Sequence, residues 1–137
     1  RNMEARKFKL VTTQKYEEHD HIEEMMIEGV VAERNGSQYI KFEQVDTTYN
    51  VTINNLIKVK EGVVTIKRSG ALNATMIFDL AKPYTTDYET PYGTLDVAVT
   101  THEIKSHFAD GVSLMISYEI MMQGKKISDN IYFIESL

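Results

Sequence analysis

The sequence predicts an all-β protein, a single closed antiparallel meander barrel of about eight to ten strands. Stretches rich in valine, isoleucine, threonine and aromatic residues alternate apolar and polar positions, and none sustains a helical period. Short polar turns separate these stretches, and three of the turns fix strand registers. A meander of this many strands has two edges, and closure into a barrel removes both.

We expect one domain over residues 1–137, with residues 1–6 as a flexible or tag-derived N-terminus. The expected strands are 8–16, 23–34, 37–45, 51–60, 63–68, 74–80, 94–101, 111–122 and 126–135. The first puts Phe8 and Leu10 on one face and Lys9 on the other. Since successive side chains of a strand point to opposite faces, this pattern indicates one buried and one solvated face.

Asn35-Gly36 is typical of a two-residue hairpin turn, because both residues tolerate positive φ. Such a turn pairs Arg34 with Ser37 and Val31 with Ile40. This register resolves the ambiguous strand 23–34 and predicts its inward residues, which are Met25, Ile27, Gly29 and Val31.

A turn at Glu61-Gly62 pairs Ile57 with Ile66, so that apolar faces meet again. It also places Asn55 opposite Arg68. Both side chains are therefore expected to point into the barrel.

A third turn, at Gly124-Lys125, pairs Ile120 with Asp129 and Tyr118 with Ile131. This register predicts that Asp129 points inward. The last strand would then contribute Phe133 to the core.

One stretch breaks the alternation. Leu95, Val97, Val99 and Thr101 share a face, yet Ile104 and Phe108 have the opposite parity. A β-bulge near 101–103 would restore agreement, because one extra residue flips the alternation once. We expect this bulge, followed by a three-residue turn at 109–111.

Composition excludes several classes of site. The chain has no cysteine, which excludes disulfides, thiolate metal sites and cysteine nucleophiles. The net charge is −5 and the lysines are scattered, which argues against nucleic-acid binding. No apolar run is long enough to span a membrane. No phosphate-binding glycine loop or serine elbow is present. We expect a cytoplasmic, non-catalytic protein without cofactor or metal, either monomer or homodimer.

The motif Arg68-Ser69-Gly70 is followed by YETPYGTLDVAVT (88–100), LMISYEI (114–120) and NIYFI (130–134). These blocks and their spacing resemble the YwiB-like family, uncharacterised bacterial proteins with a domain of unknown function. The resemblance covers residues 57–134 and implies a calycin-type (lipocalin-like) β-barrel. It implies no activity. Calycins often bind small apolar ligands inside the barrel, which is an analogy at the level of fold.

Within that element, Pro91 fixes φ for a tight turn that Tyr92 and Gly93 complete. We interpret it as the turn that sets the register of the following strand. Tyr88 and Tyr92 are also hypothesised to roof one end of the barrel.

Arg68 is the most informative candidate, because an inward guanidinium needs a partner. It could anchor the carboxylate or phosphate of a ligand, pair internally with Asp129 beside Asn55, or extend past the barrel rim. Tyr118, also inward, could donate to the same ligand or act as a core aromatic. The hypothetical ligand-binding residues are Arg68, Tyr118, Asn55, Asp129, Tyr88 and Tyr92.

His19 and His21 stand two apart among carboxylates in residues 17–24. In a strand they would share a face and could bind a metal. The segment lacks a placed third ligand and is more typical of a solvated loop, so we expect no metal site.

Two functions stay open. The barrel could bind a small apolar ligand that bears a carboxylate or phosphate. Alternatively, it could be a self-filled scaffold whose outer face, with Met26, Val30, Ala32 and Tyr39, binds another protein. A cavity of about 300 Å³ or more with an unpaired Arg68 would favour the first, and a filled interior with an Arg68–Asp129 ion pair the second.

Overall fold

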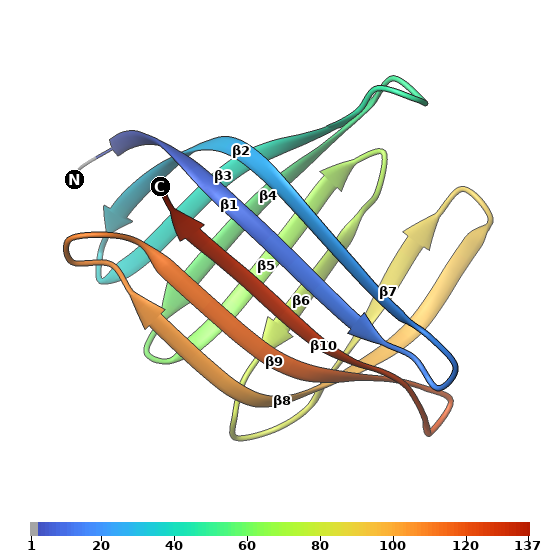
Figure 1. The fold of residues 1–137 in the computed structure, drawn as a ribbon. Helices are drawn as coiled ribbons and strands as arrows, with labels where there is room; N and C mark the ends of the chain where they lie inside the picture. The colour runs from blue at the N-terminus through green and yellow to red at the C-terminus, as the bar shows by residue number, and fades with distance from the viewer. Residues whose placement is uncertain (1–2) are drawn as a thin grey trace.

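The computed structural model describes residues 3–137, apart from the side chains of Tyr88 and Thr90. Ten antiparallel strands form one sheet that curls into a barrel (Figure 1). They are β1 (Met3–Lys15), β2 (Asp20–Arg34), β3 (Ser37–Asp46), β4 (Val51–Lys60), β5 (Val63–Gly70), β6 (Ala74–Phe78), β7 (Tyr84–Thr90), β8 (Gly93–His107), β9 (Ser113–Met122) and β10 (Lys125–Ser136). Over the described range there is no helix, and hence none that could cross a membrane.

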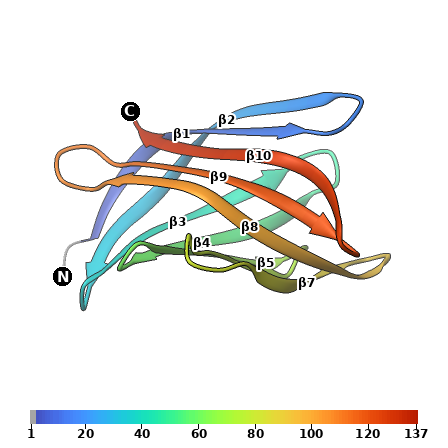
Figure 2. The same cartoon turned by 90° about the horizontal axis from the view of Figure 1, so that it is seen from below.

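The barrel closes by pairing the first strand with the last. β1 lies between β2 and β10, and the Leu137 amide donates to the Lys7 carbonyl at 2.9 Å. Both views show β10 running beside β1, and Figure 2 shows the strands wrapping around a common interior (Figures 1 and 2).

The seam between β6 and β7 is joined less completely. The Glu89 amide donates to the Asn73 carbonyl at 3.2 Å, and the Thr86 hydroxyl donates to the Thr75 carbonyl at 2.6 Å. The other neighbouring strands share continuous ladders. The meander barrel that the sequence predicts is confirmed, with this one lightly bonded seam.

The first two hairpins have the predicted registers. Val31 pairs with Ile40 around a turn whose residues Asn35 and Gly36 have φ of 52° and 80°. Both values lie in the left-handed region that this two-residue turn requires. Ile57 pairs with Ile66, and Asn55 with Arg68, around the second turn.

The predicted register of the third hairpin is wrong by one residue. The turn residues are Gln123 and Gly124, so Lys125 pairs with Met122. A bulge between 126 and 128 follows, after which Asn130 pairs with Tyr118. The parity of β10 is therefore reversed relative to the prediction. Tyr132 is buried in the core, while Phe133 lies on the outer face and is half-buried.

The predicted bulge in β8 is confirmed. Its register with β9 shifts between Thr101 and Glu103, which lets both Val99 and Ile104 face the core cluster. The connection to β9 is longer than predicted, since β8 ends at His107 and β9 begins at Ser113. Leu95 was expected to share a face with Val97 and Val99, but it is 46% exposed whereas they are buried.

Three further boundaries differ from expectation. Residues 3–6, expected to be flexible, pair with β2 along its end at 29–32. β2 begins at Asp20, so most of the acidic stretch 17–24, expected to be a loop, is strand, and the loop is confined to 16–19. β7 was not expected as a separate strand; it pairs with the start of β8 around the Pro91-Tyr92 turn.

Gly29 shows how tightly one wall is packed. It faces Phe42 across the β2–β3 ladder. A Cβ at this position would lie 2.7 Å from the Lys41 carbonyl oxygen and 3.3 Å from both Phe42 and Phe8. Only glycine lets these two aromatic side chains fill the space beside the strand.

We therefore predict that Gly29→Ala lowers the free energy of unfolding by roughly 1 to 3 kcal/mol, because backbone atoms must shift to admit the methyl group. Urea denaturation measures the change. Gly111→Ala is the matched control, since its nearest neighbour, Ser136 Oγ, would be 3.6 Å from the new Cβ. Equal stability of the two variants would contradict the close packing.

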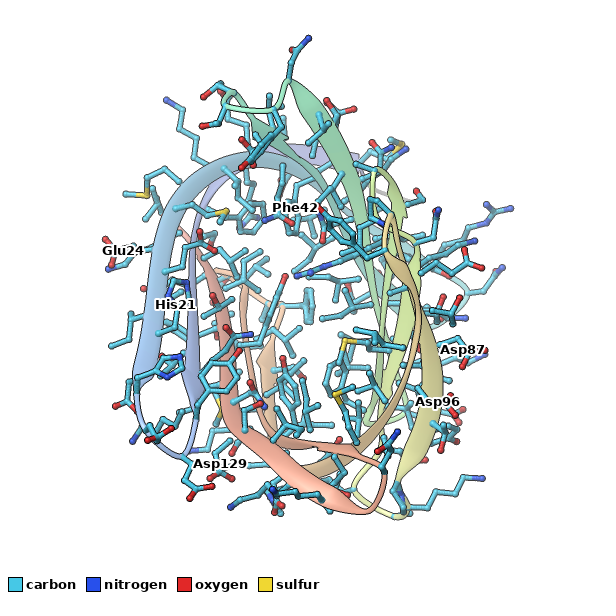
Figure 3. All side chains as sticks on the ribbon, turned by 90° about the vertical axis from the view of Figure 1, so that its right-hand side faces the viewer. His21, Glu24, Phe42, Asp87, Asp96 and Asp129 are labelled. Carbon is cyan, nitrogen blue, oxygen red and sulfur yellow. The ribbon has the colours of Figure 1, made fainter. Side chains whose placement is uncertain are left out.

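Asp87 and Asp96 face each other across the β7–β8 ladder on the outside of the barrel wall, as Figure 3 shows. A hydrogen bond with Asp96, and the repulsion from its charge, raise the pKa of Asp87 above its ordinary value. The repulsion destabilises the fold once both carboxyls are ionised.

Because the pKa is raised in the folded state, stability is lost as pH rises from the ordinary aspartate pKa through the folded one. We predict that Asp87→Asn raises the melting temperature at pH 7 and changes it little at pH 3. Thermal melts at both pH values check this, and added salt should shrink the gain. A gain of the same size at both pH values would count against repulsion as its cause.

Candidate functional site

The barrel interior is graded from apolar to polar along its axis. Inward residues change in the same direction on most strands: Leu10 to Gln14 on β1, Ile27 to His21 on β2, Ile57 to Asn55 on β4, Ile66 to Arg68 on β5, and Ile134 to Asn130 on β10. The apolar half is closely filled by side chains that are almost wholly buried, including Phe8, Ile40, Ile57, Leu114 and Ile134.

The polar half contains a cavity of about 180 Å³. It opens toward the end where the β1–β2 and β9–β10 turns lie, the right-hand side of Figure 1 and the end that faces the viewer in Figure 3. Its lining is mixed and consists of Leu10, Thr12, Thr13, Gln14, His21, Glu23, Met25, Gln44, Arg68, Met76, Tyr118, Ile120, Ile131 and Tyr132. The volume is below the value of about 300 Å³ that was set as favouring a ligand, which is also the lower limit for pockets that hold drug-sized molecules, so the space suits only a smaller ligand.

A chain of side-chain amides holds Arg68. Its Nε donates to Asn55 Oδ1 at 3.2 Å, and Asn55 Nδ2 donates to Gln44 Oε1 at 2.9 Å. Gln44 Nε2 in turn lies 3.5 Å from the sulfur of Met25. Asn55 is only 1% exposed, so this support is fixed inside the wall.

The remaining donors of Arg68 are not used within the described part of the chain. Its terminal amino groups make no hydrogen bond with any residue that the structure describes, and no described carboxylate lies within ion-pair distance of them. The side chain is half-buried and lines the cavity. Nε is used for positioning, which leaves the end of the guanidinium fork to bind a carboxylate or phosphate.

Tyr132 also lines the cavity, and its hydroxyl is a second unsatisfied group. The residue is 3% exposed and its hydroxyl has no hydrogen-bond partner within the described part of the chain. Burial raises the pKa of Tyr132 well above its ordinary value, an effect that the nearby charge of Arg68 partly opposes. The hydroxyl is therefore neutral at physiological pH and can donate to a ligand.

Tyr118 also lines the cavity and packs edge-on against Phe78, with ring centroids 4.7 Å apart. Its inward orientation is confirmed. Met25 lines the cavity, as the register of its strand predicts, and Met76 lines it as well.

Asp129 does not point inward, because the register of β10 differs from the prediction. It is exposed on the outer face, where its carboxylate pairs with Lys126 Nζ at 2.9 Å (Figure 3). The internal Arg68–Asp129 ion pair that was one alternative is thus absent. Arg68 is held by Asn55, as the register predicts, but its charge is not neutralised there.

Neither tyrosine of the proposed roof supports that hypothesis. Tyr92 is 100% exposed at the β7–β8 turn and does not line the cavity. The Tyr88 side chain lies outside the described residues. The Pro91-Tyr92 turn does set the β7–β8 register, with Thr90 paired to Gly93.

The two histidines of the acidic stretch lie in different surroundings. His19, in the turn, stacks on Tyr16 with ring centroids 4.8 Å apart. His21 lines the cavity instead. Within the described residues no group of three histidines or acidic residues is arranged to hold a metal ion.

A lateral opening joins the cavity to the surface. β2 and β3 pair only as far as Gly29 and Phe42, beyond which the β3–β4 hairpin flares away from β2 (Figure 1). The groove between them, about 770 Å³, shares Glu23, Met25 and Gln44 with the cavity. Sequence patterns did not identify Gln44 or Glu23, because this split depends on where two ladders separate.

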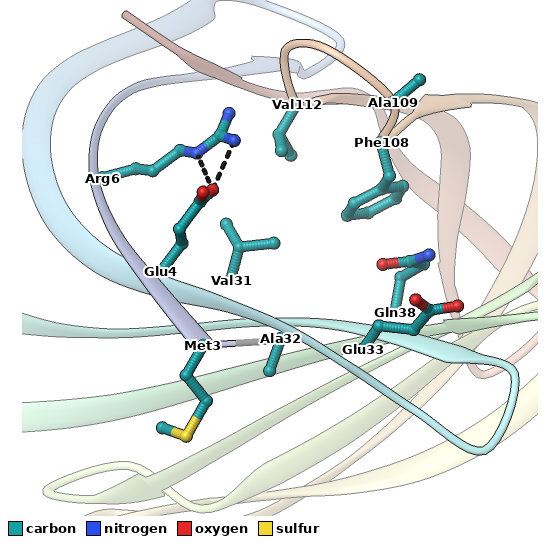
Figure 4. Close-up of a pocket in the computed structure, with 10 residues that line it drawn as sticks. All are labelled: Met3, Glu4, Arg6, Val31, Ala32, Glu33, Gln38, Phe108, Ala109 and Val112. Carbon is teal, nitrogen blue, oxygen red and sulfur yellow. Dashed lines mark hydrogen bonds and ion pairs between the residues drawn. The ribbon is translucent and has the colours of Figure 1, made fainter. Parts of the chain in front are cut away.

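A second hollow, of about 570 Å³, lies at the opposite end of the barrel (Figure 4). Its cation is already paired, since Arg6 donates to Glu4 Oε1 from Nε at 2.9 Å and from a terminal amino group at 2.5 Å. At this end of the barrel the arginine is therefore paired with a carboxylate, whereas at the other end the charge of Arg68 is not neutralised by a described carboxylate.

We predict that Tyr132→Phe raises the free energy of unfolding at pH 7 by about 1 to 2 kcal/mol, because it removes a buried hydroxyl without a partner. Since the folded pKa is raised, the wild type also loses stability as pH rises above the ordinary tyrosine value, and the variant loses less. Urea denaturation at pH 7 and pH 10.5 measures both effects. A less stable variant would show that the hydroxyl has a partner.

The chain is similar in structure to a solved protein, the ywiB protein from Bacillus subtilis. The TM-score is 0.83, with 16% sequence identity over 98% of this chain and 93% of that one. At this identity the likeness shows the fold alone. No curated protein sequence matches.

A family model described as "Domain of unknown function (DUF1934)" matches residues 8–134. The match runs from the core residue Phe8 in β1 to Ile134 in β10, and so includes every strand of the barrel and the whole lining of the cavity. The chain belongs to this family, the DUF1934 domain of unknown function.

Proposed function

We propose that this barrel binds, without catalysis, a small molecule that carries a carboxylate or a phosphate. The observation that carries the proposal is Arg68, whose terminal amino groups line the cavity without an acceptor among the described residues. Tyr132 provides a second donor nearby. The apolar parts of the lining, such as Met76 and Leu10, would contact the rest of the ligand.

Energetics support the proposal. A half-buried guanidinium without a counter-ion costs stability, and a ligand anion would offset that cost. The hydrogen bond from Arg68 Nε to Asn55 orients the guanidinium before the ligand arrives, so little side-chain entropy is lost on binding. The arrangement has the polarity of an anion-binding site at the inner end of a mixed cavity.

The lack of an evident catalytic pair supports a non-catalytic role. Among the lining residues, His21 and Glu23 have no hydrogen bond to a hydroxyl nucleophile within the described chain. We place the protein in the bacterial cytoplasm, since its likeness is to a Bacillus subtilis protein and its fold needs no disulfide. With such a ligand site the protein would resemble the calycins in fold and in ligand binding.

The alternative is a scaffold that binds another protein through its outer face. Met26 on β2 is 65% exposed, and Tyr39 lies beside Ala32 on the neighbouring strand. This role would not require the terminal amino groups of Arg68 to be accessible to a ligand.

Native mass spectrometry of the protein purified from its own host tests the proposal. We expect one small molecule bound per chain, lost on denaturation, and identifiable as a carboxylate or phosphate compound. Arg68→Met should reduce its occupancy about tenfold or more, the effect of losing a charge-assisted hydrogen bond. Its apo form should be at least as stable as the wild type, because the unpaired charge is gone.

Lys67→Met is the matched control. Lys67 is the preceding residue of β5 and is exposed on the outer face. Its loss should leave the bound mass unchanged. A wild-type protein without any bound molecule, or equal occupancy in the Arg68 variant, would favour the scaffold.

A further inference from the structure

The cavity carries charge of both signs, at different depths. Arg68, in the inner part, is half-buried, whereas Glu23 is exposed. Both line the same cavity, and no ion pair joins Glu23 to any cation within the described range. The two opposite charges face one space without neutralising each other.

Glu23 stands where the cavity meets the groove between β2 and β3, since it lines both. In the sheet it is the neighbour of Thr12, which is in turn the neighbour of Tyr132. One wall of the cavity thus leads from the buried tyrosine hydroxyl to a carboxylate at the opening.

His21 extends this polar entrance. It pairs with Gln14 on β1, and both side chains line the cavity. A ring nitrogen of the imidazole and the Glu23 carboxylate offer acceptor atoms at the outer part of the space, whereas Gln14 Oε1 already accepts from the Tyr16 hydroxyl at 3.2 Å. The inner part, with Arg68 and Tyr132, offers donors. A molecule bound in the cavity would therefore meet donors at the inner end and acceptors at the outer end.

We infer that the ligand is a small zwitterion, with an anionic group at Arg68 and an amino or other cationic group at Glu23. This inference rests on the proposed function and adds the second charge of the ligand. A simple fatty acid would leave the Glu23 carboxylate unpaired beside its tail. An amino carboxylate satisfies both ends, and the opposite charges fix its direction in the cavity.

Glu24 provides a built-in comparison. It follows Glu23 in the chain but points away from the interior, where its carboxylate lies 3.6 Å from Lys9 Nζ. Figure 3 shows Glu24 on the outer side of the β2 wall. An effect that requires a carboxylate in the cavity should therefore be lost when Glu23 is replaced and kept when Glu24 is replaced.

Two probes of equal chain length test the inference, namely hexanoate and 6-aminohexanoate. Isothermal titration calorimetry of the full chain measures both dissociation constants. We expect the amino compound to bind about threefold to tenfold more tightly, the gain from one partly exposed charge pair. The preference should shrink as salt is added.

Glu23→Gln should bring the ratio of the two constants close to one, whereas Glu24→Gln should leave it as in the wild type. Arg68→Met should weaken the binding of both probes. Hexanoate binding that depends on Arg68, with no gain from the amino group, would overturn the zwitterion and leave the proposed function standing. If neither probe binds, the zwitterion is overturned, and the native mass spectrum of the purified protein decides the proposed function separately. An amino preference that survives Glu23→Gln also contradicts the inference.

Discussion

The structure depends on one constraint, which is that only every second residue of a strand can face the interior of a barrel. Tight turns fix which residues these are, because a two-residue turn leaves no freedom in register. At the Asn35-Gly36 and Glu61-Gly62 turns this rule brings Ile40, Ile57 and Ile66 into one inward row. By the same rule Asn55 and Arg68, each two residues from the isoleucine of its strand, also point inward. The apolar core and the polar cavity are thus two parts of one alternating pattern.

The interior combines a closely packed apolar end with a polar end whose hydrogen-bonding groups are incompletely satisfied. A core made only of the residues around Ile40 and Leu114 would be filled and inert. Replacing apolar side chains by Arg68, Asn55 and Tyr132 at one end removes that packing and leaves donors without acceptors. Natural proteins tolerate such groups where they serve a purpose, and each unsatisfied donor costs stability in the absence of a partner. The amide chain through Asn55 and Gln44 limits the cost by fixing part of the guanidinium.

Local sequence signals were sufficient for most of the fold. Alternation and turn residues predicted nearly all strands and two hairpin registers, and the parity conflict around Thr101 predicted the β8 bulge. Arg68, Asn55 and Tyr118 could be placed inside because their strands follow reliable turns. β7 escaped notice because its sequence, YTTDYET, has no aliphatic residue and so no alternation of apolar and polar positions, although tyrosine and threonine favour strands.

The last hairpin shows where such reasoning fails. Gly124 can be either the first or the second residue of a tight turn, and β10 is apolar on both faces, with Ile131 outside and Tyr132 inside. Neither register could be rejected by burial alone. The bulge between Lys126 and Ser128 reverses the parity of β10, and because it was not foreseen, Asp129 was assigned to Arg68 and Tyr132 was missed. The split that exposes Glu23 depends on the tertiary divergence of β2 from β3, which no local pattern records.

The pairing of β1 with β10 has a consequence for synthesis on the ribosome. Of these ten strands, β1 is made first and must wait for β10 before its second edge is covered, so the nascent chain carries an open sheet until β10 has emerged. Contacts between segments far apart in the chain are slow to form because loop-closure entropy opposes them. The barrel therefore closes late, and the open intermediate is the species that chaperones would meet.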